Sequence, residues 1–126
     1  MTCPFCHPEA ERLVASNEHA LALGDGYPIA EGHTLVVPKR HAASLFDLSA
    51  EEQAAIWALA TEVRNHLQAQ LSPDGFNIGL NDGEAAGQTI PHAHIHIIPR
   101  RRGDVPDPRG GVRWVIPELA AYWTIQ

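Results

Sequence analysis

The sequence predicts one α+β domain, in which an antiparallel sheet packs against a single long helix. Short apolar stretches rich in β-branched residues predict strands, and one segment of about 20 residues has helical spacing. Two strands precede that helix and two follow it, with short connections, an order typical of an antiparallel sheet with a helix on one face. The 126 residues, 44% of them hydrophobic, can form one core.

The first two predicted strands precede the helix. The apolar stretch His19–Gly24 is followed by the turn-rich segment Asp25–Pro28. The second strand, His33–Val37, is rich in β-branched residues and lies between Gly32 and Pro38.

The predicted helix begins at a capping box and ends at a turn. In the sequence SAEE, the Ser49 side chain accepts from the Glu52 amide while the Glu52 side chain reaches back to the Ser49 amide. Apolar side chains follow at helical spacing: Ile56, Leu59, Ala60, Val63, Leu67 and Leu71. The segment 72–75, SPDG, ends the helix.

The last two predicted strands are Phe76–Leu80 and Ile90–Ile98, joined by the glycine-rich segment Asn81–Thr89. The second of them carries histidines at alternate positions: His92, His94 and His96. Alternate residues of a strand share a face, so we expect the three rings to project together. A solvated face usually carries Lys, Glu or Thr, and three titratable rings therefore indicate function.

Two interpretations of these histidines compete. They could supply a catalytic zinc site, with His92, His94 and a third ligand, or one imidazole could be a nucleophile that attacks phosphorus or carbon. The preceding loop offers backbone and side-chain donors where an anionic oxygen would bind, at Gly83, Gly87, Gln88 and Thr89. This loop favours the nucleophile.

The two cysteines, Cys3 and Cys6, form a C-x-x-C pair. In a cytosolic protein this spacing indicates metal or redox chemistry rather than a structural disulfide. A redox pair normally follows a strand, and none is predicted before Cys3. Half of a zinc site fits better, provided that two further ligands come from elsewhere.

Composition excludes several classes of function. The formal net charge of −6 argues against nucleic acid as the main partner. No apolar run approaches the roughly 18 residues that cross a bilayer, and the first residues lack the layout of a signal peptide. We expect a cytoplasmic protein with no membrane partner.

Two stretches, GHTLVVPKRH at 32–41 and NDGEAAGQTIPHAHIHIIPR at 81–100, closely resemble the histidine triad (HIT) family of nucleotide hydrolases and transferases. The resemblance runs from Cys3 to about Asp104. It implies a single HIT domain over residues 1–126, with a core at about 3–104 and a C-terminal tail at 105–126. It also implies a sheet of about five strands, one long helix and a two-fold homodimer that joins two sheets.

The resemblance also implies a reaction. Family members cleave the α-phosphate of a nucleotide through a nucleotidyl-histidine intermediate, so the expected substrate is a purine nucleotide: a dinucleoside polyphosphate, such as a diadenosine polyphosphate, or a nucleoside phosphoramidate. His94 matches the nucleophile and His96 the histidine that contacts the phosphoryl group. Gln88 and Thr89 match donors on the phosphate side, and Thr89 stands where many relatives have serine.

Substrate-binding residues follow from the same match. Asn81 and the loop residue Gly87 belong to the pocket, and Asp25 aligns with the residue that binds the ribose hydroxyls. His33 either supports the triad or is a packed core histidine.

The resemblance also implies two further metal ligands beside the cysteines. Some bacterial members bind zinc through a C-x-x-C pair and two histidines, which here are Cys3, Cys6, His41 and His92. Four protein ligands leave no open position, so this zinc would be structural. Two other functions stay open: a nucleotidyltransferase or phosphorylase, which usually has glutamine at the position of His96, and a nucleotide-binding protein with little turnover.

Overall fold

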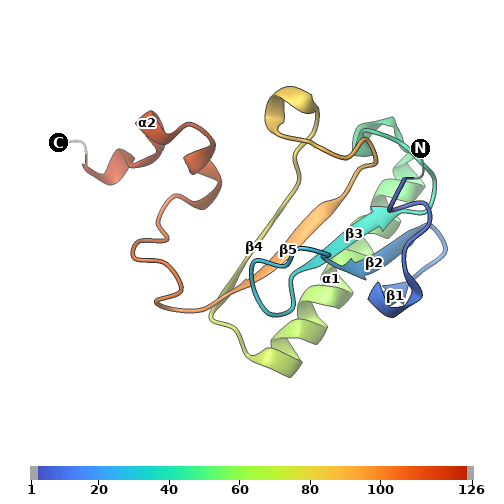
Figure 1. Ribbon diagram of the computed structural model, residues 1–126, viewed down its shortest axis with the longest axis horizontal. Helices are drawn as coiled ribbons and strands as arrows, with labels where there is room; N and C mark the ends of the chain where they lie inside the picture. The colour runs from blue at the N-terminus through green and yellow to red at the C-terminus, as the bar shows by residue number, and fades with distance from the viewer. Residues whose placement is uncertain (1–2, 125–126) are drawn as a thin grey trace.

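The structure is a computed structural model that describes residues 3–124. Five strands form one antiparallel sheet in the order β1-β2-β3-β5-β4. The strands are β1 (Leu13–Ser16), β2 (Ala20–Gly24), β3 (Thr34–Pro38), β4 (Gly75–Gly79) and β5 (Ile95–Arg100). The long helix α1 (Ala50–Leu71) lies along one face of this sheet, so the predicted α+β class is confirmed (Figure 1).

Shorter helices connect the strands or lie in the C-terminal segment. They are η1 (Ala10–Arg12), η2 (Leu45–Asp47), η3 (Glu84–Ala86), η4 (Gly111–Val115), α2 (Pro117–Ala120) and η5 (Tyr122–Thr124). Within residues 3–124, no helix combines the length and the apolar character needed to cross a membrane.

The main core lies between α1 and the sheet. The apolar face predicted for the helix is buried, at Ile56, Leu59, Ala60, Val63 and Leu67. It packs with sheet residues that include Ala22, Val36, Ile95 and Ile97. Fully burying a side chain of this kind contributes about 1.5–3 kcal/mol, so this layer anchors the sheet.

The opposite face of the sheet is covered by the N-terminal segment. Phe5 is 3% exposed and packs with Leu23, Leu35 and Val37 in a second cluster. All five residues of β3 are consequently buried. This packing holds the C-x-x-C segment against the sheet.

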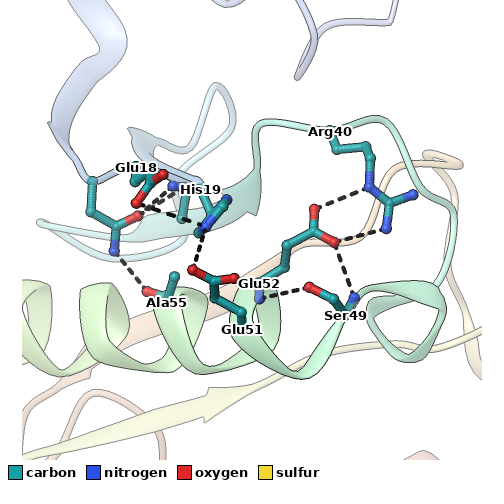
Figure 2. A network of polar contacts seen from close by, with 9 residues as sticks. Glu18, His19, Arg40, Ser49, Glu51, Glu52 and Ala55 are labelled. Atoms are coloured by element: carbon teal, nitrogen blue, oxygen red, sulfur yellow. Dashed lines mark hydrogen bonds and ion pairs between the residues drawn. The ribbon is translucent and has the colours of Figure 1, made fainter.

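The start of α1 is tied to the segment after β3, as Figure 2 shows. Ser49 Oγ accepts from the Glu52 amide at 3.1 Å and Glu52 Oε1 accepts from the Ser49 amide at 3.0 Å, the predicted capping box. Arg40 donates to both carboxylate oxygens of Glu52, at 2.8 and 3.0 Å. The hydrogen bonds from Arg40 and Ser49 lower the pKa of Glu52 to about 2.

Two predictions about strands need correction. The prediction from local pattern omitted β1, a four-residue edge strand whose pairing with β2 is irregular after Leu13. The predicted histidine strand begins later than expected, because β5 starts at Ile95 and includes only His96 of the three histidines. The Ala93 amide instead donates to the Ala42 carbonyl at 2.8 Å, which pulls the preceding residues away from strand pairing.

The C-terminal segment continues past the β4 side of the sheet and is set apart from the strands (Figure 1). Cation–π contacts form within this segment. The Arg109 guanidinium lies 4.7 Å from the Trp123 ring centroid, and the Arg113 guanidinium lies 4.7 Å from the Tyr122 ring centroid. β4 therefore keeps one edge without a partner strand in the described part of the chain.

Candidate functional site

The three histidines divide between two places instead of sharing one face. His92 is 0% exposed and its ring faces the N-terminal cysteines, while the ring centroids of His94 and His96 lie 5.2 Å apart beside a cavity. The division follows from the irregular backbone before β5, which turns His92 away from its neighbours.

The His92 ring is held in one tautomer. Its Nε2 donates to the Pro38 carbonyl at 2.8 Å, so in the neutral ring Nδ1 keeps a lone pair. Burial lowers the pKa of His92, and the neighbouring His41 and His94 lower it further. Nδ1 lies 3.4 Å from Cys3 Sγ and 3.5 Å from Cys6 Sγ.

The four predicted metal ligands come together, and we call Cys3, Cys6, His41 and His92 the Cys-His cluster. Their ligand atoms all lie within 4.8 Å of one another. Cys6 Sγ lies 3.2 Å from His41 Nδ1, and the two Nδ1 atoms lie 3.1 Å apart. A tetrahedral zinc site has S···N and N···N separations of about 3.5 and about 3.3 Å, so the cluster has dimensions that suit a metal ion.

The Cys6 thiol favours its neutral form when no metal is bound. Desolvation, together with the hydrogen bond and charge of Cys3, raises its pKa. A metal ion would reverse this preference, because metal ligation stabilises the thiolate. The cluster therefore has the chemistry of a site whose two sulfurs ionise when a cation binds.

The backbone also selects the tautomer of His94. Its Nδ1 lies 2.9 Å from the His92 carbonyl oxygen, which can only accept, so Nδ1 carries the proton and Nε2 keeps a lone pair. The Phe5 ring packs against His94 at 5.0 Å and against His92 at 5.7 Å, between centroids. The neutral ring thus has the form that a nucleophile needs.

His96 is oriented through a chain of hydrogen bonds that begins at a backbone amide. Ile29 N donates to His33 Nδ1 at 3.3 Å, so His33 Nε2 carries the ring proton. That Nε2 lies 3.0 Å from His96 Nδ1 and 3.3 Å from Asp25 Oδ2. By donating to His96 Nδ1, His33 leaves His96 with its proton on Nε2.

Burial keeps the imidazoles of His33 and His96 neutral. It is the largest effect lowering the pKa of His33 and of His96, and Asp25 partly opposes it in both. Neighbouring imidazoles lower the pKa of His96 further, first His94 and then His33. His96 is therefore a neutral N–H donor at pH 7.

The cavity beside His94 and His96, which we call the histidine cavity, has a volume of about 470 Å³. Its lining includes six residues predicted for catalysis or substrate binding: Asp25, Asn81, Gly87, Thr89, His94 and His96. Asp25 Oδ1 accepts from the Tyr27 amide at 2.7 Å, which orients the carboxylate in the β2–β3 loop. A phosphoryl group, a hydroxyl-bearing ring and two imidazoles can meet in this space.

The Gln88 amide is occupied within the chain. Its Nε2 donates to the carbonyls of Ala43 and Ile90, at 2.7 and 3.0 Å, and its Oε1 accepts from the Gly83 amide at 2.8 Å. Gly87, at φ +99°, adopts a backbone conformation that favours glycine. In this structure Gln88 braces the loop, and Thr89 lines the cavity.

Phe5 and Arg12 are among the lining residues that the sequence-based prediction missed. Phe5 is the apolar residue inside the C-x-x-C pair, and its position between two ligands was a usable signal. Arg12 donates from Nε to the Gly24 carbonyl at 2.9 Å, and no local pattern marked it.

Known proteins resemble this chain in sequence and fold. The family model described as "HIT domain" matches residues 8–103. An uncharacterized HIT-like protein of Mycoplasma pneumoniae is 44% identical over 87 residues, covering 69% of this chain and 60% of that protein. A bis(5'-adenosyl)-triphosphatase of Dictyostelium discoideum is 38% identical over 71% of this chain and 60% of its own length.

One solved structure also covers the C-terminal segment. It is a Zn-bound histidine triad family protein from Mycobacterium smegmatis, 33% identical, with a TM-score of 0.74 over 99% of this chain and 98% of that chain. By contrast, this chain spans 60% of the Mycoplasma and Dictyostelium relatives described above.

Proposed function

The chain belongs to the HIT domain family, and from that premise we propose that it hydrolyses a purine nucleotide at the α-phosphate through a nucleotidyl intermediate on His94. The observation that carries this proposal is the 2.9 Å contact between His94 Nδ1 and the His92 carbonyl oxygen. It leaves the Nε2 lone pair free beside a cavity that also contains Asp25 and Thr89.

In the first step, the His94 Nε2 lone pair forms a bond to the α-phosphorus while the bond to the leaving group breaks. The leaving group keeps that electron pair and is protonated by solvent, while the Nε2–H of the neutral His96 donates a hydrogen bond at the reacting phosphoryl group. The His94 ring becomes cationic, and the His92 carbonyl stabilises the charge through Nδ1–H.

In the second step, water attacks the phosphorus and the P–N bond breaks. The electron pair returns to His94, whose ring is again neutral. The water proton passes to solvent, so the enzyme is restored and the nucleoside monophosphate leaves.

The remaining cavity residues bind and orient the substrate. The Asp25 carboxylate accepts from the ribose hydroxyls, and Asn81 contacts the same part of the pocket. Thr89 Oγ1 and the backbone at Gly87 meet the phosphoryl oxygens. Gln88 acts on catalysis through the loop that it braces, and His33 is a positioning residue that sets the tautomer of His96.

We also propose that the Cys-His cluster binds a structural zinc ion. Two thiolates and two imidazoles match the preference of zinc and leave no position for a reactive water. The Mycobacterium smegmatis relative described as Zn-bound supports this assignment. The metal would cross-link the N-terminal segment to the residues around His41 and His92, and its thiols favour a reducing, cytoplasmic location.

The assembly that we propose is a homodimer. β4 is an edge strand with no partner in the described part of the chain, and an open edge in so small a sheet favours aggregation. Symmetric pairing through this edge would cover it in both copies.

Turnover in ¹⁸O-labelled water tests the proposed reaction. Diadenosine triphosphate and adenosine 5'-phosphoramidate should each give AMP with one ¹⁸O on its phosphate, because water resolves the intermediate. Added inorganic phosphate should not divert AMP into ADP; if it does, the protein is a phosphorylase. Failure of both substrates to turn over, with AMP still bound, would make the protein a binder and contradict the proposal.

A further inference from the structure

We propose that the Arg12 guanidinium forms the base-stacking wall of the histidine cavity and makes the site favour purines over pyrimidines. This inference rests on the proposed function, because it requires a nucleotide whose ribose is held at Asp25. The residues described so far act on the phosphate and the ribose, whereas Arg12 would select the base.

Arg12 is fixed at the ribose end of the cavity. It is the last residue of η1, and its Nε donates to the carbonyl of Gly24, the residue before Asp25. The phosphoryl group is expected beside His94 and Thr89. A base attached to a ribose at Asp25 can therefore extend toward Arg12, away from the reacting phosphorus.

The guanidinium presents a face, rather than an edge, to Gly26. A side-chain Cβ at Gly26 would lie 3.6 Å from Arg12 Cζ, 3.6 Å from Nη1 and 3.7 Å from Nη2. Three nearly equal distances place that position above the plane of the group. Because residue 26 is glycine, no side chain of that residue separates Arg12 from the cavity that both residues line.

A planar cation is suited to stacking on a nucleobase. Arginine stacks on aromatic faces through dispersion and cation–π attraction. Among the described residues that line the cavity, Arg12 is the one side chain with a permanent positive charge. A purine offers this plane a larger π surface than a pyrimidine does, so the stacking energy should differ between them.

The test measures dissociation constants for AMP, CMP and adenosine by calorimetry, in the wild type and in Arg12→Lys. Lysine keeps the charge and loses the plane. We expect the wild type to prefer AMP over CMP, and Arg12→Lys to reduce that preference by about three- to tenfold. Adenosine should weaken along with AMP, because the lost contact is with the base.

Arg64→Lys is the matched control. Arg64 lies on α1, with its guanidinium 5.1 Å from the Phe76 ring centroid, and does not line the histidine cavity. The Arg64→Lys variant should prefer AMP over CMP to the same extent as the wild type. The melting temperatures of Arg12→Lys and Arg12→Leu are measured beside that of the wild type. An unchanged melting temperature shows that a change in base preference does not come from a folding defect.

The opposing results are distinct. An AMP-to-CMP preference unchanged in Arg12→Lys overturns the role of Arg12. Equal weakening of AMP and CMP, with adenosine unaffected, assigns Arg12 to the phosphate and also overturns it. A wild type that binds no nucleotide overturns the proposed function and this inference together.

Discussion

The His92 carbonyl oxygen lies 2.9 Å from Nδ1 of His94, while the His92 ring faces the two cysteines. One residue therefore belongs to both parts of the site. Its ring belongs to the Cys-His cluster, and its backbone selects the tautomer of the proposed nucleophile. A change in the cluster should reach His94 through this carbonyl, a distance of two residues along the chain.

The first prediction concerns the metal. Cys3→Ser combined with Cys6→Ser should remove one bound zinc per chain, lower the melting temperature by about 10 °C and reduce kcat by about tenfold. Stability falls because the N-terminal segment loses its cross-link, and activity falls because His92 positions His94 less well. Metal analysis, calorimetry and steady-state kinetics check the three effects.

A matched control for the metal prediction is His7→Ser. His7 is an exposed residue next to Cys6 and lies outside the Cys-His cluster, so zinc content and stability should stay unchanged. Full loss of activity on zinc removal, restored by zinc without any change in stability, would identify a catalytic metal instead.

The second prediction concerns His33. His33→Phe should lower kcat by about tenfold, because His96 Nδ1 loses the donor that keeps its proton on Nε2. His33→Gln should restore part of that loss, since its amide N–H can donate to the same atom. Equal kcat for the two variants would show that His33 is only a packed core residue.

The third prediction concerns acid pH. Burial lowers the pKa of His33 and His96, so both remain neutral below the ordinary imidazole value of 6.5. Protonation of His33 and His96 should therefore reduce kcat/KM only below pH 6.5. The same groups favour the native state above pH 6.5, and that contribution declines as pH falls from 6.5 through their native pKa values. Imidazole pKa values of His33 and His96 at or above 6.5, measured by NMR titration, would contradict their neutral state.

The fourth prediction concerns the helix cap. Ser49→Ala should cost about 1 kcal/mol in free energy of unfolding, because the Glu52 amide loses its acceptor. Glu52→Gln should destabilise most at neutral pH. Its carboxylate pKa is lowered, so its contribution is present above pH 4.5 and is lost as pH falls toward about 2. Glu51→Gln, on the same helical turn but outside the capping box, is the matched control. Denaturant unfolding at several pH values makes the comparison.

The fifth prediction concerns the dimer. The wild type should sediment as a homodimer at micromolar concentration, and Ile78→Lys should shift it toward monomer. Ile78 lies on the edge strand β4 and is 40% exposed, so a charge there would be buried by symmetric pairing. A monomeric wild type would contradict the proposed assembly.

Local sequence patterns predicted the parts of the fold that depend on local physics. The capping box at Ser49 and the apolar face of α1 were both predicted correctly, because capping and helical periodicity are properties of neighbouring residues. The start of β5 was predicted wrongly. The Ala42 carbonyl, which is distant in sequence, accepts from the Ala93 amide, so strand pairing begins only at Ile95.

The site shows the same limit. The resemblance named the four residues of the Cys-His cluster, and the structure brings them together. The resemblance could not show that the Gln88 side-chain amide donates to the carbonyls of Ala43 and Ile90, because those contacts depend on the folded loop. Arg12 was missed for a similar reason. Its position in the cavity depends on the hydrogen bond from its Nε to the Gly24 carbonyl, which forms only in the folded chain.

The most direct test of the central claim is to trap the covalent intermediate on His94. Rapid base quenching during turnover of adenosine 5'-phosphoramidate, followed by peptide mass spectrometry, should find adenylate on the peptide that contains His94. The bond should be stable to base and labile to acid, as a P–N bond is. His94→Ala should carry no adenylate and should lose turnover while it still binds AMP. Adenylate on another residue, or a His94→Ala variant with more than about a tenth of wild-type kcat, would contradict the account.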